Sequence, residues 1–340
     1  MSLDLNTTWF ILVGVLLSGY AILDGFDLGV GALHLFTKGD HDRRIMLNSI
    51  GPVWDGNEVW LVTGGGALFA AFPDVYATSF SGFYLAFILL LVALIFRAVA
   101  IEFRSKRPGE RWRKIWDRSF SISSIVSSLL IGVALGNIIL GIPLTAEGEY
   151  MGGLLGLLRP YPLFVGLTTV ALFAMHGAIY VVMKTEGELQ AQVRRWIPRT
   201  IGLFVAGYVI TTVLTLVFIP HMTTTLRDHP ILLVVPVLNA LAIANIPREI
   251  HKGRDFRAFL SSCAAMLLLM ALFGIGMYPD MIYSSPLPEN SLTIYNAASS
   301  AKTHQIMLII AIIGMPIVVA YTISIYWIFR GKVKLDAYSY

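Results

Sequence analysis

The chain has 340 residues, of which 56% are hydrophobic and only 14% are charged. Its mean hydropathy is +0.72, whereas about a quarter of the residues of a soluble domain are charged. These values exclude an ordinary soluble enzyme, and recurring apolar runs of about 20 residues predict an all-α integral membrane protein. The single cysteine, Cys263, excludes an intrachain disulfide and a thiolate metal cluster.

Nine apolar segments are long enough to cross a bilayer as helices, and clusters of glycine, proline and charge separate them. In chain order they are 9–36, 52–72, 78–103, 118–143, 162–184, 200–219, 230–246, 258–278 and 305–329. The first and fifth both run from a glycine to a polar-glycine pair ten residues on. This faint repeat is compatible with two related helical bundles. Small residues, among them Gly29, Gly65 and Gly66, are expected to let helices pack closely.

The basic residues sort by side of the membrane. Of the 25 Lys and Arg, 20 lie in the loops after segments one, three, five and seven and in the C-terminal tail, while the opposite side has Arg159, Arg227 and Lys302. The positive-inside rule then places the N-terminus outside and the C-terminus in the cytoplasm. The formal net charge of +4 is therefore explained by topology, and we expect no nucleic-acid binding.

Acidic residues recur inside the first two segments. "LDGFDLGVG" carries Asp24 and Asp27, and "WDGNEVWLVTGGG" carries Asp55 and Glu58. Each pair is spaced i, i+3, so both acids lie on one face of a helix.

The third segment adds an arginine at a similar depth. "IFRAVAIEF" carries Arg97 and Glu102. At 1.5 Å per residue, Asp27 lies about 14 Å, Glu58 about 10 Å and Arg97 about 9 Å from the cytoplasmic end of its helix. We therefore expect the charges of three helices to meet in the cytoplasmic half of the bilayer.

A charge at the bilayer centre costs about 2.5–3.5 kcal/mol on insertion scales. Arg97 can neutralise one or two of the acids, so the others must be hydrated or protonated. Carboxyl groups that exchange protons with the cytoplasm suit a proton-uptake path. Structural or subunit-interface pairing, and binding of an ion or substrate, remain open as alternatives.

Histidine is the residue that a haem or metal site in a membrane helix would need. Only His176 lies well inside a segment, and no two histidines share a segment. We expect His176 to pack between helices, and we expect no metal or haem ligand in this chain.

Four stretches, in chain order and across nearly the whole sequence, carry a family resemblance. They are "AILDGFDLGVG", "RRIMLNSIGPVWDGNEVWLVTGGGALFAAFP", "FSGFYLAFILLLVALIFRAVAIEFRSK" and "NSLTIYNAASS". In them the chain resembles subunit II of the cytochrome bd-type quinol oxidases. The resemblance implies a bacterial inner-membrane complex of respiratory electron transport that oxidises quinol and reduces O2 to water, with proton uptake from the cytoplasm.

The resemblance also implies a fold and partners. Subunit II is expected to be haem-free, with two four-helix bundles (1–144 and 145–280), then a ninth peripheral helix and a cytoplasmic tail (281–340). Its partner, subunit I, is expected to hold low-spin haem b, high-spin haem b and haem d. A small accessory membrane subunit and a structural quinone are further expectations, beside quinol, O2 and the lipid bilayer.

Individual residues match the motifs of this family. Asp55, in W-D-G-N, matches the residue at which the family's proposed proton route begins. Glu58 follows one helical turn later. Val53 stands where some members of the family have histidine. Asp27, in G-F-D-x-G-V-G, matches a residue associated with assembly and haem retention. The proton-path candidates are therefore Asp55 and Glu58. The expected structural or assembly cluster comprises Asp24, Asp27, Arg97, Glu102, Asp117 and Trp54.

The main alternative is a proton-coupled secondary transporter, which would also keep carboxylates inside the membrane. Such a transporter favours broken helices and inverted repeats around a midplane site. Here the acids lie off-centre, in one half of the chain. A purely structural membrane scaffold is the second alternative.

Overall fold

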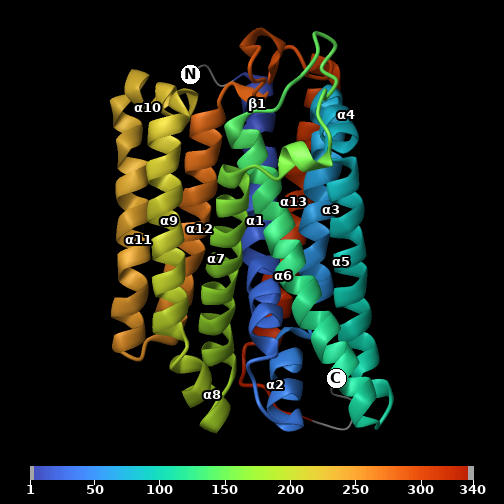
Figure 1. Ribbon diagram of the computed structural model, residues 1–340, viewed down its shortest axis with the longest axis vertical. Coiled ribbons are helices and arrows are strands. Elements are labelled where there is room, and N and C mark those ends of the chain that lie inside the picture. Colours follow the sequence, from blue (N-terminus) through green and yellow to red (C-terminus); the bar gives the residue numbers. More distant parts are fainter. Residues whose placement is uncertain (1–3, 336–340) are drawn as a thin grey trace.

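In the computed structural model, which describes residues 4–335, the chain forms a bundle of long helices with roughly aligned axes (Figure 1). The first half contains α1 (Leu5–His34), α2 (Asp40–Ile50), α3 (Trp54–Ala71), α4 (Pro73–Gly82), α5 (Tyr84–Phe103), the 3-10 turn η1 (Arg104–Lys106), α6 (Glu110–Leu140) and η2 (Leu154–Leu157). The second half contains α7 (Pro160–Lys184), α8 (Gly187–Arg194), α9 (Ile197–Phe218), η3 (Pro220–Thr223), α10 (Thr224–Asp228), η4 (Pro230–Leu233), α11 (Val234–His251), α12 (Asp255–Met277), η5 (Pro288–Asn290) and α13 (Ala301–Ile328). Two short strands, β1 (Asp280–Ile282) and β2 (Leu292–Thr293), pair antiparallel.

Eight of the described helical segments are long and apolar enough to cross a membrane. They correspond to eight of the nine predicted segments; the other, 52–72, forms α3. Polar residues in its first turns, including Asp55, Asn57 and Glu58, lower its hydropathy, so a crossing by α3 remains a prediction. The predicted third segment is in fact two helices, because α4 ends at Gly82 and α5 begins at Tyr84.

Helix α1 occupies a central place in the bundle. It packs against α3, α6, α7 and α12, while α5 packs on α6, α9 on α7, and α11 on α12. In Figure 1, α9, α11 and α12 gather on one side of α1 and α7, and α3 and α5 lie on the other. Helix α13 contacts α1 and α3.

Two glycines allow α1 and α7 to cross closely. A Cβ added to Gly29 would lie 1.8 Å from the carbonyl oxygen of Phe173, and one added to Gly177 would lie 2.5 Å from the backbone of Gly29. The packing role predicted for Gly29 is confirmed. For Gly65 and Gly66 it stays a prediction, because a Cβ at either position meets nothing within 4 Å in the described chain.

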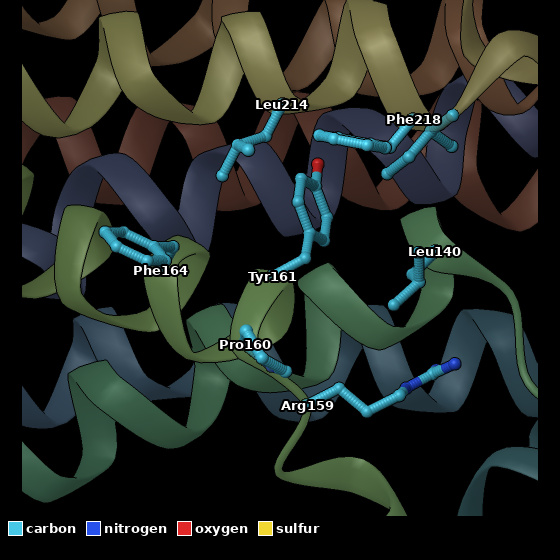
Figure 2. Close-up of a pocket in the computed structure, with 8 residues that line it drawn as sticks. Leu140, Arg159, Pro160, Tyr161, Phe164, Leu214 and Phe218 are labelled. Atoms are coloured by element: carbon cyan, nitrogen blue, oxygen red, sulfur yellow. The ribbon is translucent and has the colours of Figure 1, made fainter.

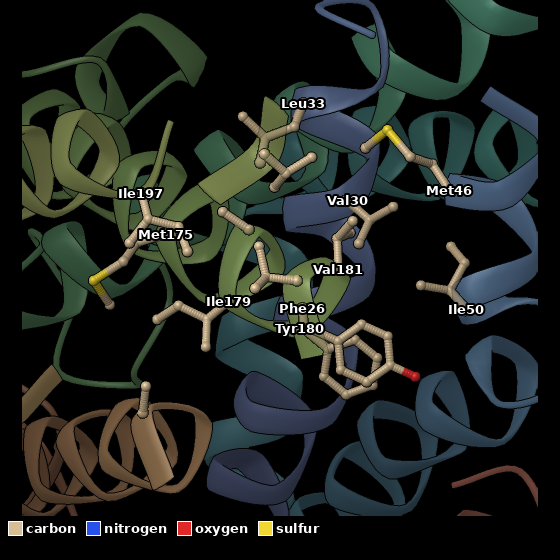
Figure 3. Packing of buried hydrophobic residues seen from close by; sticks show 14 of the residues in the cluster. Phe26, Val30, Leu33, Met46, Ile50, Met175, Ile179, Tyr180, Val181 and Ile197 are labelled. Atoms are coloured by element: carbon tan, nitrogen blue, oxygen red, sulfur yellow. The ribbon is translucent and has the colours of Figure 1, made fainter. Parts of the chain in front are cut away.

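The largest apolar core joins α1, α2 and α7 (Figure 3). Phe26 of α1 stacks on Tyr180 of α7, with ring centroids 3.9 Å apart. The Tyr180 hydroxyl then donates to the carbonyl oxygen of Ser49 in α2 at 2.9 Å. This packing fixes α1 on one side, so that its acidic face is directed at α3 and α5.

The two ends of the bundle differ in structure. Helix α1 begins at the end that carries β1 and β2, here the hairpin end, and α13 finishes at the opposite end near α2, here the α2 end (Figure 1). At the α2 end, Lys332 Nζ donates to the carbonyl oxygens of Met183 and Thr185 at 2.9 and 2.8 Å. The segment after α13 therefore caps the last turn of α7.

Candidate functional site: a buried carboxylate cluster

Arg97 of α5 is the centre of an ion cluster built by α1, α3 and α5. Its Nη1 and Nη2 donate to both oxygens of Asp24 at 2.9 and 2.5 Å. Nη1 also donates to Glu58 Oε1 at 3.0 Å, and Nη2 lies 3.9 Å from Asp27 Oδ2. The predicted meeting of charges from three helices is confirmed for these four residues.

The formal charges of this cluster do not balance. One guanidinium faces three carboxyl groups, and the side chains of Arg97, Asp24 and Asp27 are completely buried. Glu58 is the outer member, with 26% of its side chain exposed. Because an uncompensated buried carboxylate is costly, the cluster is short of positive charge, which a bound proton would supply.

Two neutral residues that the sequence did not single out complete the cluster. Asn57 Nδ2 donates to Asp27 Oδ2 at 2.7 Å and to the carbonyl oxygen of Leu23 at 3.2 Å. The Tyr326 hydroxyl of α13 donates to Asn57 Oδ1 at 2.9 Å. Asn57 lies inside the W-D-G-N motif, so the motif could have indicated it. Tyr326 lies near a segment end, where aromatic residues are common for interfacial reasons alone.

Asp55 lies outside the cluster. It is exposed in the first turn of α3, one turn before Glu58. Within residues 4–335 it makes no hydrogen bond or ion pair. The series Asp55, Glu58 and Asp24 therefore passes from an exposed carboxyl, through a partly exposed one, to a completely buried one.

Two other predicted cluster members have different surroundings. Trp54 is 8% exposed and belongs to the apolar core around Phe26. Glu102 is half-buried and lies five residues beyond Arg97 on α5, which places it about 7.5 Å farther along the helix axis.

Asp117 belongs to a second ion network at the α2 end, so its predicted membership of the Arg97 cluster is wrong. Its carboxylate accepts from Arg104 Nε at 2.5 Å and from Arg43 Nη1 at 2.9 Å, and it lies 2.7 Å from His34 Nε2. Arg104 lies seven residues beyond Arg97, which corresponds to about 10 Å along the helix axis. Sequence reasoning counted Arg104 and Arg43 as loop charges that set topology, and therefore missed their pairing. The network joins α1, α2, η1 and α6 at one end.

His176 packs between helices, as predicted. Its Nδ1 lies 2.7 Å from Ser262 Oγ and its Nε2 lies 3.1 Å from the carbonyl oxygen of Ile22. Its ring stacks on Phe259 at 4.8 Å. Both ring nitrogens are therefore engaged within the chain, which does not fit a haem ligand at this position.

Three buried polar atoms around the Arg97 cluster have no hydrogen-bond partner within residues 4–335. They are Asp27 Oδ1, Arg97 Nε and the Tyr20 hydroxyl oxygen. Unsatisfied buried polar groups are rare in folded proteins and commonly mark sites that water enters.

These features define a class: a polytopic helical membrane protein with an off-centre, acid-rich cluster in its interior. Comparison with known proteins identifies the family. The family profile described as cytochrome bd terminal oxidase subunit II matches residues 5–329, and the chain belongs to this family.

Known relatives match over nearly their whole length. The chain is 36% identical to cytochrome bd-I ubiquinol oxidase subunit 2 of Escherichia coli strain K12, over 98% of this chain and 96% of that protein. It is 34% identical to cytochrome bd ubiquinol oxidase subunit 2 of Bacillus subtilis strain 168, over 97% of each chain. The fold is similar to a chain of the bd oxidase from Geobacillus thermodenitrificans, with a TM-score of 0.79 and 20% identity over 96% of this chain and 98% of that one.

Family membership decides between the classes left open by the sequence. The chain is a bacterial inner-membrane subunit of a bd-type terminal oxidase, a quinol:oxygen oxidoreductase of respiratory electron transport, and its partner is subunit I. The transporter alternative is thereby excluded.

Proposed function

We propose that this chain is the haem-free subunit of the oxidase and carries protons from the cytoplasm toward the oxygen-reducing centre through Asp55 and Glu58. The haems, low-spin b, high-spin b and d, belong in this proposal to subunit I. The observation that carries it is the graded exposure of three carboxyl groups, from Asp55 through Glu58 to Asp24. The unsatisfied polar atoms Asp27 Oδ1 and Arg97 Nε support it, because they suit a hydrated interior.

This proposal requires the α2 end to face the cytoplasm. We propose nine crossings, α3 included, with the N-terminus outside and the C-terminus inside. The excess of Lys and Arg in the loops at the α2 end supports this orientation. We propose two bundles, within 1–144 and 145–280, with α13 as an added peripheral helix. Helix α1 contacts α3 and α6 in the first, α11 contacts α12 in the second, and α7 joins the two through its contacts with α1 and α6.

Subunit I is proposed to cover the outer face of α3 beyond Asp55, which stays open at the α2 end of a row of exposed residues. Val59, Val62 and Phe69 continue it at helical spacing and are 54%, 73% and 59% exposed. Gly66 lies in the same row and has open space above it. Small residues let a neighbouring helix approach closely in lipid, so this face suits contact with another subunit.

The test is Asp55→Asn in the assembled complex, with turnover and haem content measured together. Asn keeps the size of the side chain but cannot transfer a proton. General acid–base steps contribute about 10²–10⁴-fold, and a relay partly bypassed by water loses less. We expect turnover at saturating quinol to fall about tenfold or more with normal haem content, and Asp55→Glu to keep part of the activity.

Matched variants separate chemistry from assembly. Asp228→Asn changes an exposed acid at the hairpin end and should leave turnover unchanged. Asp27→Asn should lose haem together with activity, because Asp27 is completely buried and held by Asn57. Haem loss from Asp55→Asn in proportion to its lost activity would make Asp55 an assembly contact. Full activity with full haem would remove it from both roles.

A further inference from the structure

An apolar groove opens at the hairpin end, between the end of α6, the start of α7 and the end of α9. Its volume is about 400 Å³, within the range of about 300–1,000 Å³ that small-molecule sites occupy. Figure 2 shows Tyr161 directed toward Leu214 and Phe218 of α9, with Phe164 beside it on α7. The Tyr161 hydroxyl is satisfied by Thr215 Oγ1 at 2.8 Å, so this side of the groove presents apolar surface.

One arginine lies at the rim of this groove. Arg159 extends from the start of α7 beside Leu140 (Figure 2). Its Nη2 donates to Asn137 Oδ1 at 3.1 Å and to the carbonyl oxygen of Gly141 at 2.7 Å. These two bonds hold the guanidinium in place, so a ligand would not have to order it.

The charge of Arg159 has no acidic partner within residues 4–335. Its Nε is buried without an acceptor, and Nη1 makes no hydrogen bond within the same residues. Burial lowers the pKa of its guanidinium, as expected for a charge that is partly removed from water. Arg159 is also the N-cap residue of α7, and the positive end of a helix dipole adds to the attraction for an anion.

We propose that this groove binds an anionic phospholipid, with an acyl chain against Tyr161, Leu214 and Phe218 and the phosphate at Arg159. The charge favours an anionic headgroup, and the groove requires an apolar tail attached to it. A free phosphate would leave the apolar surface uncovered. A zwitterionic phospholipid would bring a cation together with its phosphate, so the charge of the arginine would not be neutralised. The site lies at the end of the bundle opposite the carboxylate cluster, so it is independent of the proposed proton path.

The test is native mass spectrometry of the purified complex, titrated with phosphatidylglycerol or with phosphatidylcholine of the same acyl chains. The variant is Arg159→Gln. The matched control is Arg227→Gln, because Arg227 is exposed at the same end and makes no ion pair within the described chain. A third variant, Leu214→Trp, fills the groove and keeps the arginine.

We expect wild-type complex to retain phosphatidylglycerol in preference to phosphatidylcholine. Arg159→Gln should weaken phosphatidylglycerol binding about tenfold, equivalent to about 1.4 kcal/mol, and abolish the preference, while Arg227→Gln should change neither. Leu214→Trp should weaken binding of both lipids.

Three results would overturn the proposal. The first is equal phosphatidylglycerol binding in Arg159→Gln and wild type, or equal losses in Arg159→Gln and Arg227→Gln. The second is a quinone, rather than a phospholipid, retained by wild type and lost from Leu214→Trp. The third result applies if Arg159→Gln does not assemble: it is phosphatidylglycerol binding in Leu214→Trp that is unchanged from wild type.

Discussion

Replacing Arg97 with methionine tests the physical account of the carboxylate cluster most directly. Arg97 forms two hydrogen bonds with Asp24 and one with Glu58, and it is the cation paired with Asp27. Methionine fills much of the same space, so the main effect is loss of the positive charge. Two completely buried carboxyl groups would then be left without a counter-charge.

The expected loss of stability is large. Removing one partner of a buried ion pair costs about 3–5 kcal/mol, mostly because the other partner is left charged and desolvated. Adding Asp24→Asn to Arg97→Met removes the carboxylate that lies closest to the arginine. Contacting residues couple by about 0.5–3 kcal/mol, so the double variant should recover about 2 kcal/mol or more.

The assay is thermal unfolding of the purified complex in detergent, followed by size-exclusion chromatography with haem absorbance. Arg118→Met is the control, because Arg118 lies on α6, is exposed and makes no ion pair within residues 4–335. We expect its midpoint to match wild type. If the double variant were no more stable than Arg97→Met, stranded charge could not be the reason for the loss. If Arg97→Met matched Arg118→Met, the cluster would not contribute to stability at all.

Four further predictions concern a hydrogen bond, a helix crossing, a buried carboxyl group and the membrane topology. Tyr326→Phe removes the hydroxyl that donates to Asn57, and unfolding measurements should show a loss of about 1 kcal/mol; the exposed Tyr321→Phe should show none. Gly29→Val should prevent assembly of the complex, because the added Cβ would collide with the backbone of α7; size-exclusion chromatography would detect this. Gly14→Ala on the same helix is the control, because a Cβ at Gly14 has open space, and it should be neutral or slightly stabilising. Burial raises the pKa of Asp280 from 3.8 to about 6, so the folded chain holds this proton more tightly than the unfolded chain. The contribution of Asp280 to stability should be fully present below a pH of about 4 and should be lost as pH rises through about 6. An Asp280→Asn variant with the same fall in stability between these pH values as wild type would contradict the assignment. A topology reporter fused after the last residue should read cytoplasmic and one at Asn290 outside, and identical readings would refute the odd number of crossings.

The sequence determined the membrane class, eight of the helical segments and the acids that face one another. Helical periodicity placed Asp24 and Asp27 on one face, and the rise per residue placed Arg97 at their depth. Depth and face follow from local geometry alone, so these charges could be expected at one level of the bundle. The stretch around Asp55 also carries part of the family resemblance.

The tertiary structure decided how the polar residues are shared among helices. Asn57 joins the cluster because α3 lies beside α1, and Tyr326 joins it because α13, remote in sequence, contacts both helices. Asp117 leaves it because its carboxylate meets Arg104 and His34 at the α2 end. Neighbouring helices in a bundle are chosen by side-chain packing and close backbone contacts, which one segment's sequence does not specify. Sequence therefore fixes which residues each helix presents and at what depth, and only packing decides which of them meet.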